Sequence, residues 1–174
     1  MNISKIVVGE LQTNCYLIEK DGECLLVDPG DEYLKIKDFI KDKKIVGILI
    51  THKHFDHIGC IKELVNDYNI SVYDDINLKE GINYISTFSV DVIKTYGHTM
   101  DSICFYFDKE KVMFTGDFLF YDTIGRCDFP ESDYKEMLKS IKKIKVYSND
   151  IVIYPGHGRE TTLGREKEEN IYFK

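Results

Sequence analysis

The chain has 174 residues, of which 43% are apolar and 30% charged, and its net charge at pH 7 is −7. This composition is typical of a globular protein and excludes a disordered chain, and the negative charge argues against a nucleic-acid partner. The apolar runs are too short to cross a bilayer and the N-terminus lacks a hydrophobic secretory segment, so we expect one cytoplasmic domain spanning residues 1–174, with no membrane partner.

The first half of the chain is expected to form strands and two helices. Alternating apolar residues predict strands over residues 6–8, 14–19 and 23–28. A helix over residues 32–43 is expected to bury an apolar face made of Leu34, Ile36, Phe39 and Ile40. The run 45–50 predicts a strand covered on both faces. A second helix should follow it, with apolar residues at helical spacing: Ile58, Ile61, Leu64, Val65 and Tyr68.

The second half alternates short strands with one well-marked helix. Strands are expected over residues 70–73, 90–96, 103–107, 112–114 and 151–154. The helix is expected over residues 133–144, with Ser132 or Asp133 as its N-cap. Because strands and helices are mixed along the chain, we expect a layered α/β fold rather than a helical bundle or a pure β-sandwich.

The five histidines of the chain form its clearest functional pattern. Three of them fall in the window 52–57, which reads His-x-His-x-Asp-His. His98, Asp117 and His157 each follow a glycine that comes just after an expected strand. Loops at the ends of buried strands commonly carry active sites. Since imidazole and carboxylate groups bind Zn²⁺, Fe and Mn²⁺, the pattern predicts a metal site.

The spacing within residues 52–57 suits two metal ions. In an extended segment, His52 and His54 point to the same side and can bind one ion. Asp56 and His57 are expected to begin the following helix and turn away, where they can bind a second ion.

These residues resemble the metallo-β-lactamase superfamily, whose signature is HxHxDH followed by distant His, Asp and His ligands. The resemblance is closer to its small glyoxalase II-like hydrolases and extends from about residue 3 to the C-terminus. It rests on these motifs: Gln12-Thr13-Asn14-Cys15-Tyr16-Leu17, Val27-Asp28-Pro29-Gly30, Thr51 to Gly59, Gly97-His98-Thr99, Thr115-Gly116-Asp117, Ile124-Gly125-Arg126, Pro155-Gly156-His157-Gly158 and Thr161-Thr162-x-Gly164-x-Glu166.

The resemblance implies a four-layer αββα sandwich with a two-metal site at one edge of its paired sheets. It implies one metal ion on His52, His54 and His98 and a second on Asp56, His57 and His157, with Asp117 bridging the two. Asp28 would orient one of the ligands. Two divalent ions are the expected cofactors, with zinc favoured and iron or manganese as alternatives.

Two metal ions in such a site convert a shared water into a hydroxide nucleophile. We therefore predict a hydrolase that attacks the acyl carbonyl of a small-molecule thioester or ester, a hydroxyacyl thioester above all, with Asp56 and Asp117 as catalytic residues. Neither Gly-x-Ser-x-Gly nor a Walker-type Gly-Lys-Ser/Thr occurs in the chain, so no other catalytic motif competes for this role.

Three alternatives stay open. The superfamily includes iron-dependent persulfide dioxygenases that use one metal, against which the seven filled ligand positions argue. Other hydrolases of the same fold act on lactones, β-lactams or phosphodiesters. The third alternative is a metal-binding module without catalytic activity, which would not need Asp117 as a bridge.

The arginines, Tyr121 and the cysteines are further candidates for specific roles. Only three of the 23 basic residues are arginines, namely Arg126, Arg159 and Arg165, and surface ion pairs are the ordinary alternative for each. Arg126 is the first candidate for binding an anionic group of the substrate, and Tyr121 is the second. The odd number of cysteines without a Cys-x-x-Cys pair predicts reduced thiols. Cys60 is expected to pack against a helix, the role of Cys127 is left open, and nothing marks an oligomeric interface.

Overall fold

The first of two large β-sheets comes from the N-terminal half of the computed structural model, which describes all 174 residues. Its strands pair in chain order: β1 (Asn2–Val8), β2 (Thr13–Lys20), β3 (Glu23–Val27), β4 (Ile45–Leu49) and β5 (Val72–Tyr73). The first three strands are antiparallel, whereas β3, β4 and β5 are parallel. Parallel strands need crossover connections. These connections contain α1 (Tyr33–Ile40), α2 (Phe55–Ile58) and α3 (Ile61–Tyr68).

The second sheet comes from the C-terminal half. Its strands follow the order β13 (Thr161–Thr162), β12 (Val152–Pro155), β9 (Val112–Gly116), β8 (Ile103–Phe107), β7 (Phe88–Lys94) and β6 (Gly81–Ile85). β12 runs parallel to β9, and α4 (Tyr134–Ile144) lies in the connection between them. A separate hairpin of β10 (Leu119–Phe120) and β11 (Thr123–Ile124) follows β9. The chain ends with α5 (Leu163–Glu169) and the 3₁₀ turn Ile171–Phe173.

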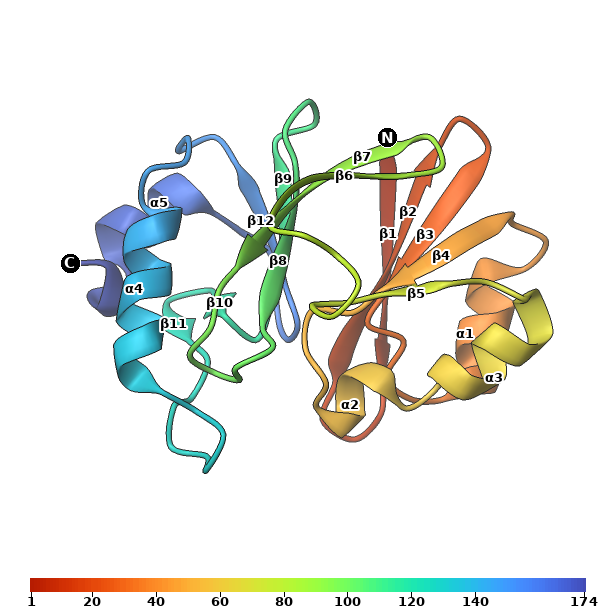
Figure 1. Ribbon diagram of the computed structural model, residues 1–174, viewed down its shortest axis with the longest axis horizontal. Helices are drawn as coiled ribbons and strands as arrows, with labels where there is room; N and C mark the ends of the chain where they lie inside the picture. The colour runs from red at the N-terminus through yellow and green to blue at the C-terminus, as the bar shows by residue number, and fades with distance from the viewer.

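Three apolar clusters hold the layers together. Because side chains alternate across a strand, Tyr16 and Ile18 of β2 pack between the two sheets while Cys15 and Leu17 face α1 and α3. A third cluster fills the space between the second sheet and the helices α4 and α5. Figure 1 shows α1 and α3 on one side of the paired sheets and α4 and α5 on the other. The expected four-layer αββα sandwich is confirmed.

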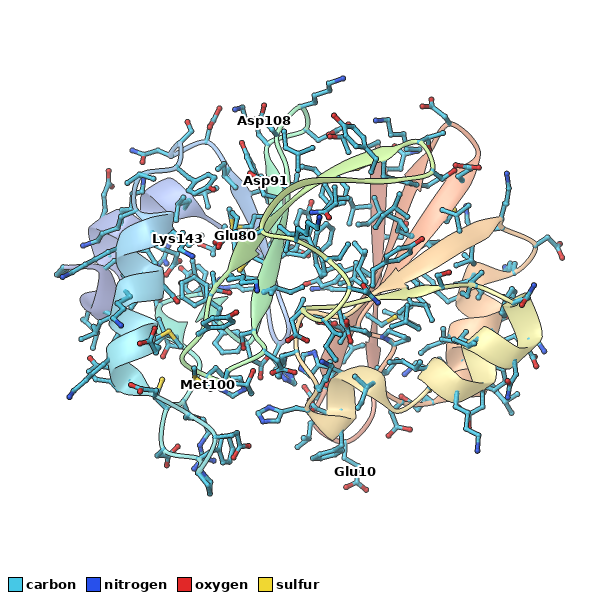
Figure 2. The ribbon with its side chains drawn as sticks, viewed as in Figure 1. Glu10, Glu80, Asp91, Met100, Asp108 and Lys143 are labelled. Carbon is cyan, nitrogen blue, oxygen red and sulfur yellow. The ribbon has the colours of Figure 1, made fainter.

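Helix α4 shows why its segment folds as expected. The Asp133 side chain caps the first turn by accepting hydrogen bonds from the backbone N–H groups of Lys135 and Glu136. The positive charges of Lys142 and Lys143 in the last turn interact favourably with the negative end of the helix dipole and stabilise the helix. Lys143 also pairs with Glu80 over 2.7 Å, and both residues are labelled in Figure 2. The helix expected over residues 133–144 is thus confirmed.

Several details of the sequence-based prediction were wrong. Leu34 is 78% exposed, although we placed it on the buried face of its helix. It lies two residues before Ile36, about 200° away around the helix axis, whereas Ile40 follows Ile36 on the buried face. The second helix is split into α2 and α3 at Gly59-Cys60. The strand β6, the short strands β10, β11 and β13, and helix α5 were not predicted.

The cysteines form no disulfide bonds, and all five are free. Cys60 is 4% exposed and packs in the cluster beneath α1 and α3, as expected for a residue that packs against a helix. None of the helices has the length and apolar character needed to span a membrane.

Candidate metal centre

The loops after four strands converge on one edge of the sandwich. His52 follows β4 of the first sheet, and His98, Asp117 and His157 follow β7, β9 and β12 of the second. Residues 54–57 complete the group, since His54 precedes α2, which contains Asp56 and His57. All seven side chains that the histidine pattern singled out lie together as three overlapping groups able to hold metal ions.

The first group consists of His52, His54 and His98. Nδ1 of His54 lies 3.0 Å from Nε2 of His52 and 3.0 Å from Nε2 of His98. Three imidazole nitrogens therefore point at one small volume, two of them through Nε2 and one through Nδ1.

The second group consists of Asp56, His57 and His157. Oδ2 of Asp56 lies 3.5 Å from Nε2 of His57 and 3.4 Å from Nε2 of His157. The hydroxyl of Thr13 donates a 2.8 Å hydrogen bond to the same carboxylate oxygen, which holds the Asp56 carboxylate in place.

Asp117 lies between the two groups. Its Oδ1 is 3.3 Å from Nε2 of His57, and its Oδ2 is 3.4 Å from Nε2 of His157 and 3.7 Å from Nε2 of His98. Gly156 permits this approach, because a Cβ at that position would lie 2.2 Å from Oδ1 of Asp117. One carboxylate therefore contacts histidines of both groups.

These separations fit metal coordination. Ligand atoms around a tetrahedral ion with bonds of about 2.0–2.1 Å lie about 3.3–3.4 Å apart. Nε2 of His57 and Oδ1 of Asp117 are buried and have no hydrogen-bond partner. A buried polar atom without a partner costs stability, and coordination to a cation would satisfy both atoms. The donor set fits two neighbouring metal ions.

Each histidine has one ring nitrogen that faces the centre and one that faces away from it. The nitrogen that faces away lies beside a hydrogen-bond acceptor, and this contact fixes the other nitrogen toward the centre. The five pairs are His52 with the Thr51 hydroxyl at 3.2 Å, His54 with Glu131 at 3.3 Å, His57 with Asp28 at 3.0 Å, His98 with the Arg126 carbonyl at 2.9 Å, and His157 with the Leu11 carbonyl at 3.0 Å. The imidazoles are therefore oriented by the protein itself.

Electrostatics divides four of the histidines into two kinds. Burial disfavours the charged form and holds the pKa values of His52 and His98 below the ordinary value. Burial has the same effect on His57, but the carboxylates of Asp28 and Asp117 outweigh it and raise its pKa to about 10. Asp117 and Asp56 likewise outweigh burial and raise the pKa of His157 to about 10.

The two aspartates of the centre stay ionised. Burial works against the charged form of Asp56, but hydrogen bonding from His157 and the nearby charge of His57 lower its pKa overall. The same two histidines hold the pKa of Asp117 well below its ordinary value despite burial. Both carboxylates are therefore available as ligands over the whole physiological pH range.

A cleft of about 470 Å³ opens over the centre. Its walls combine ligand residues with apolar side chains, of which Leu11, Phe55, Phe120 and Phe129 are the largest. Arg126 lines the cleft, but its guanidinium donates two hydrogen bonds to Asp128 and lies 4.2 Å from the Phe129 ring. Tyr121 lies beyond Phe120, in an adjoining pocket.

Several residues of the centre have no role assigned by the sequence analysis, although Thr13 and Thr51 belong to its motifs. Thr13, Thr51 and Glu131 contact the ligand residues through hydroxyl or carboxylate groups, and Thr13 also forms a backbone bridge with His157. Thr51 adjoins the histidine window, so its position was a usable signal. Glu131 lies in a polar loop 77 residues from His54, and no local pattern marks it. Cys127 lies in the same loop, and its thiol donates to the Gly125 carbonyl.

Comparison with known proteins agrees with this geometry. The family model described as the metallo-beta-lactamase superfamily matches residues 8–75 and 75–157. Hydroxyacylglutathione hydrolase GloC of Haemophilus influenzae is 31% identical, over 99% of this chain and 98% of its own length. The crystal structure of BLEG-1 B3 metallo-β-lactamase superposes with a TM-score of 0.94 at 30% identity, over 99% of this chain and all of that one.

A second solved structure adds information about metals. TTHA1623 in a di-iron-bound form superposes with a TM-score of 0.89 at 30% identity, over 97% of this chain and 99% of that one. Family model, relative and structures agree with the converging histidines and aspartates, and we conclude that this chain belongs to the metallo-β-lactamase superfamily of metal-dependent hydrolases.

Proposed function

We propose that the protein is a binuclear hydrolase that cleaves an acyl thioester, in the manner of glyoxalase II. The position of Asp117 carries this proposal, since its two carboxylate oxygens lie within 3.7 Å of histidines from both ligand groups. A single-metal enzyme has no need for a carboxylate between two complete sets of donors.

This proposal assigns all seven residues of the centre to the two ions. His52, His54 and His98 would hold the first ion and Asp56, His57 and His157 the second, with Asp117 shared between them. Two divalent ions held by these residues would supply a water of lowered pKa and would stabilise the charge that develops on the substrate carbonyl oxygen. We propose zinc as the metal, because nitrogen and carboxylate donors suit it.

The residues of the chain prepare the reaction in two ways. Asp56 is kept ionised, so its carboxylate can accept a hydrogen bond from the attacking water and hold it in line with the carbonyl carbon. The apolar side chains of Leu11, Phe55 and Phe129 line the cleft and offer apolar surface to a substrate beside the reacting groups. Arg126 lies on the wall of the cleft, and although two of its N–H groups are paired with Asp128, its remaining N–H groups would contact an anionic part of the substrate.

The proposed substrate is a small hydroxyacyl thioester. The similarity to a hydroxyacylglutathione hydrolase over nearly the full length of both chains supports this class. A cleft of about 470 Å³ has room for a small molecule.

The test combines elemental analysis of the purified protein with hydrolysis of S-D-lactoylglutathione, followed by loss of thioester absorbance. We expect about two metal ions per chain and turnover that is lost in His54→Ala and in Asp117→Ala. One iron per chain without thioester cleavage would support the persulfide dioxygenase alternative instead. Two metals with cleavage of lactones or β-lactams, but not of thioesters, would assign another hydrolase activity to the same centre.

A further inference from the structure

Of the three arginines, Arg159 alone makes no ion pair. The guanidinium of Arg126 is occupied by Asp128, at 2.6 and 2.8 Å. Arg165 pairs with Asp122 at 2.7 Å and with Glu166 at 2.8 Å. The acidic neighbour of Arg159 in sequence, Glu160, pairs with Lys5 at 3.2 Å. The charge of Arg159 is therefore available to a ligand.

The side chain of Arg159 is nevertheless held in a defined position. Its guanidinium carbon lies 3.4 Å from the centre of the Tyr121 ring, and that of Arg165 lies 3.6 Å from the same point. Two guanidinium groups this close to one ring centre would overlap if they shared a face, so they stack on opposite faces. Stacking on the ring restrains the side chain before any ligand binds.

Tyr121 is itself fixed by the C-terminal helix. Glu166 of α5 is fully buried and accepts a 3.0 Å hydrogen bond from the backbone N–H of Asp122, in the β10–β11 turn. Arg165 of the same helix covers the second face of the ring. Both faces of Tyr121 are thus occupied by arginines, which leaves the ring as a support for Arg159 rather than a surface for the substrate.

Arg159 lies beside the metal centre. It follows the ligand residue His157 by two positions and lines a pocket of about 330 Å³ together with Phe120, Tyr121 and His157. Phe120 and His157 also line the cleft over the metal centre, so the two cavities adjoin. A substrate in the cleft can therefore extend past Phe120 to the guanidinium.

We propose that Arg159 binds a carboxylate of the substrate, which selects acyl thioesters that carry a carboxylate over neutral ones. A guanidinium matches a carboxylate with two parallel hydrogen bonds. Among the three arginines, Arg159 is the one whose guanidinium is not already paired with a carboxylate of the chain. The choice of substrate rests on the proposed hydrolase function, whereas the carboxylate site itself does not require turnover.

Equilibrium binding to the metal-loaded protein tests the site directly. Dicarboxylates from malonate to adipate are titrated calorimetrically against monocarboxylates of matching length, so that one carboxylate can reach the metal centre and the other Arg159. Because charge-assisted hydrogen bonds are strong, we expect at least one dicarboxylate to bind roughly tenfold more tightly than its monocarboxylate. Arg159→Gln should remove this preference, and Arg159→Lys should keep part of it, since the charge remains and the planar fork is lost.

Lys109→Gln is the matched control. It makes the same change in net charge on an exposed residue next to Asp108, which Figure 2 shows at the opposite end of the molecule from Glu10 and Met100. Glu10 and Met100 adjoin the loops of Leu11 and His98 at the centre. Lys109→Gln should therefore keep the wild-type preference for dicarboxylates over monocarboxylates. Loss of this preference in Lys109→Gln would show that it depends on net charge alone and would overturn the proposal.

Two further outcomes separate this proposal from the proposed function. A dicarboxylate preference that survives in Arg159→Gln, or that is missing from the wild type at every length, overturns the carboxylate site even if thioesters are hydrolysed. A preference that depends on Arg159 in a protein that cleaves no thioester supports the site and rejects the substrate class.

Discussion

The buried carboxylate of Asp28 accepts a hydrogen bond from Nδ1 of His57 over 3.0 Å. The same carboxylate accepts hydrogen bonds from the backbone N–H of Thr51 at 2.9 Å and from its hydroxyl at 2.7 Å. Asp28 has a left-handed backbone with φ of 49°, which turns the chain at the end of β3 and directs the side chain inward. It therefore orients His57 directly and His52 through Thr51, which agrees with the orienting role proposed for it.

Asp28→Asn should weaken metal binding at this centre. Both oxygens of Asp28 accept hydrogen bonds, so the amide NH₂ of asparagine would face a donor whichever way it is placed. Loss of such a partner typically lowers metal affinity about 10–100-fold. We expect a decrease of this size for at least one ion in a chelator competition titration.

Asp21→Asn provides the control for that variant. Asp21 has a similar left-handed φ of 51°, but it lies in the exposed β2–β3 turn. The Asp21→Asn variant should therefore bind both ions as tightly as the wild type does. Wild-type affinity for both ions in Asp28→Asn would contradict the orienting role.

Metal binding should release protons. The raised pKa values of His57 and His157, about 10 for each, keep both imidazoles protonated near pH 7.5 until a metal ion binds. Coordination requires the neutral form, so the two histidines together should release about two protons per chain. Calorimetric titration of chelator-treated protein in buffers of different ionisation enthalpy measures this number. Metal affinity should also rise with pH, and binding heats that do not depend on the buffer would contradict the assignment.

The chelator-treated protein should lose stability at alkaline pH. The histidine pKa is about 6.5 in an unfolded chain, and it is about 10 for His57 and His157 in the folded one. A raised folded pKa contributes stability that is fully present below pH 6.5 and is lost as the pH rises toward 10.

We expect urea denaturation of the chelated protein to show a decrease in the free energy of unfolding on the order of 2–4 kcal/mol for each of the two histidines between pH 6.5 and 9.5. The lowered pKa values of Asp56 and Asp117 also contribute stability, but this contribution depends on pH in the opposite sense. It is lost only as the pH falls through the acid range. Metal-loaded protein should lack the alkaline decrease, since its histidines are already neutral. If the free energy of unfolding of the chelated protein did not change with pH in this range, the raised pKa values of the paired histidines would be contradicted.

Gly156→Ala should disrupt the shared position of Asp117. The added Cβ would lie 2.2 Å from Oδ1 of Asp117 and 2.8 Å from Cε1 of His57, so one of these side chains must move. We expect elemental analysis to show fewer than two metal ions per chain.

Gly158→Ala is the comparison for Gly156→Ala. Its added Cβ has no heavy atom within 4 Å, although its φ of +75° adds backbone strain of about 1–2 kcal/mol. This variant should melt at a lower temperature and still bind both ions. Equal metal content in the two variants would show that the close approach at Gly156 is not needed.

Much of the candidate ligand set could be predicted from the sequence because its pattern is encoded locally. A buried strand, a glycine and a polar side chain follow one another at His98, Asp117 and His157, and each such turn places its side chain at the end of a strand. Helix α4 was equally readable, since its cap, its apolar spacing and its terminal lysines agree. Helix α5 was missed because only Leu163, Gly164 and Glu166 of its short, mostly charged sequence are buried.

Contacts between distant segments were decided only by the tertiary structure. The sequence by itself determined the fold family and the side chains that converge, because strand and turn patterns depend on neighbouring residues. It did not determine which nitrogen of each histidine faces the centre, that Arg126 pairs with Asp128, or that Arg159 lies on Tyr121. These features depend on the packing of side chains from separate loops against each other, and no local pattern records that packing.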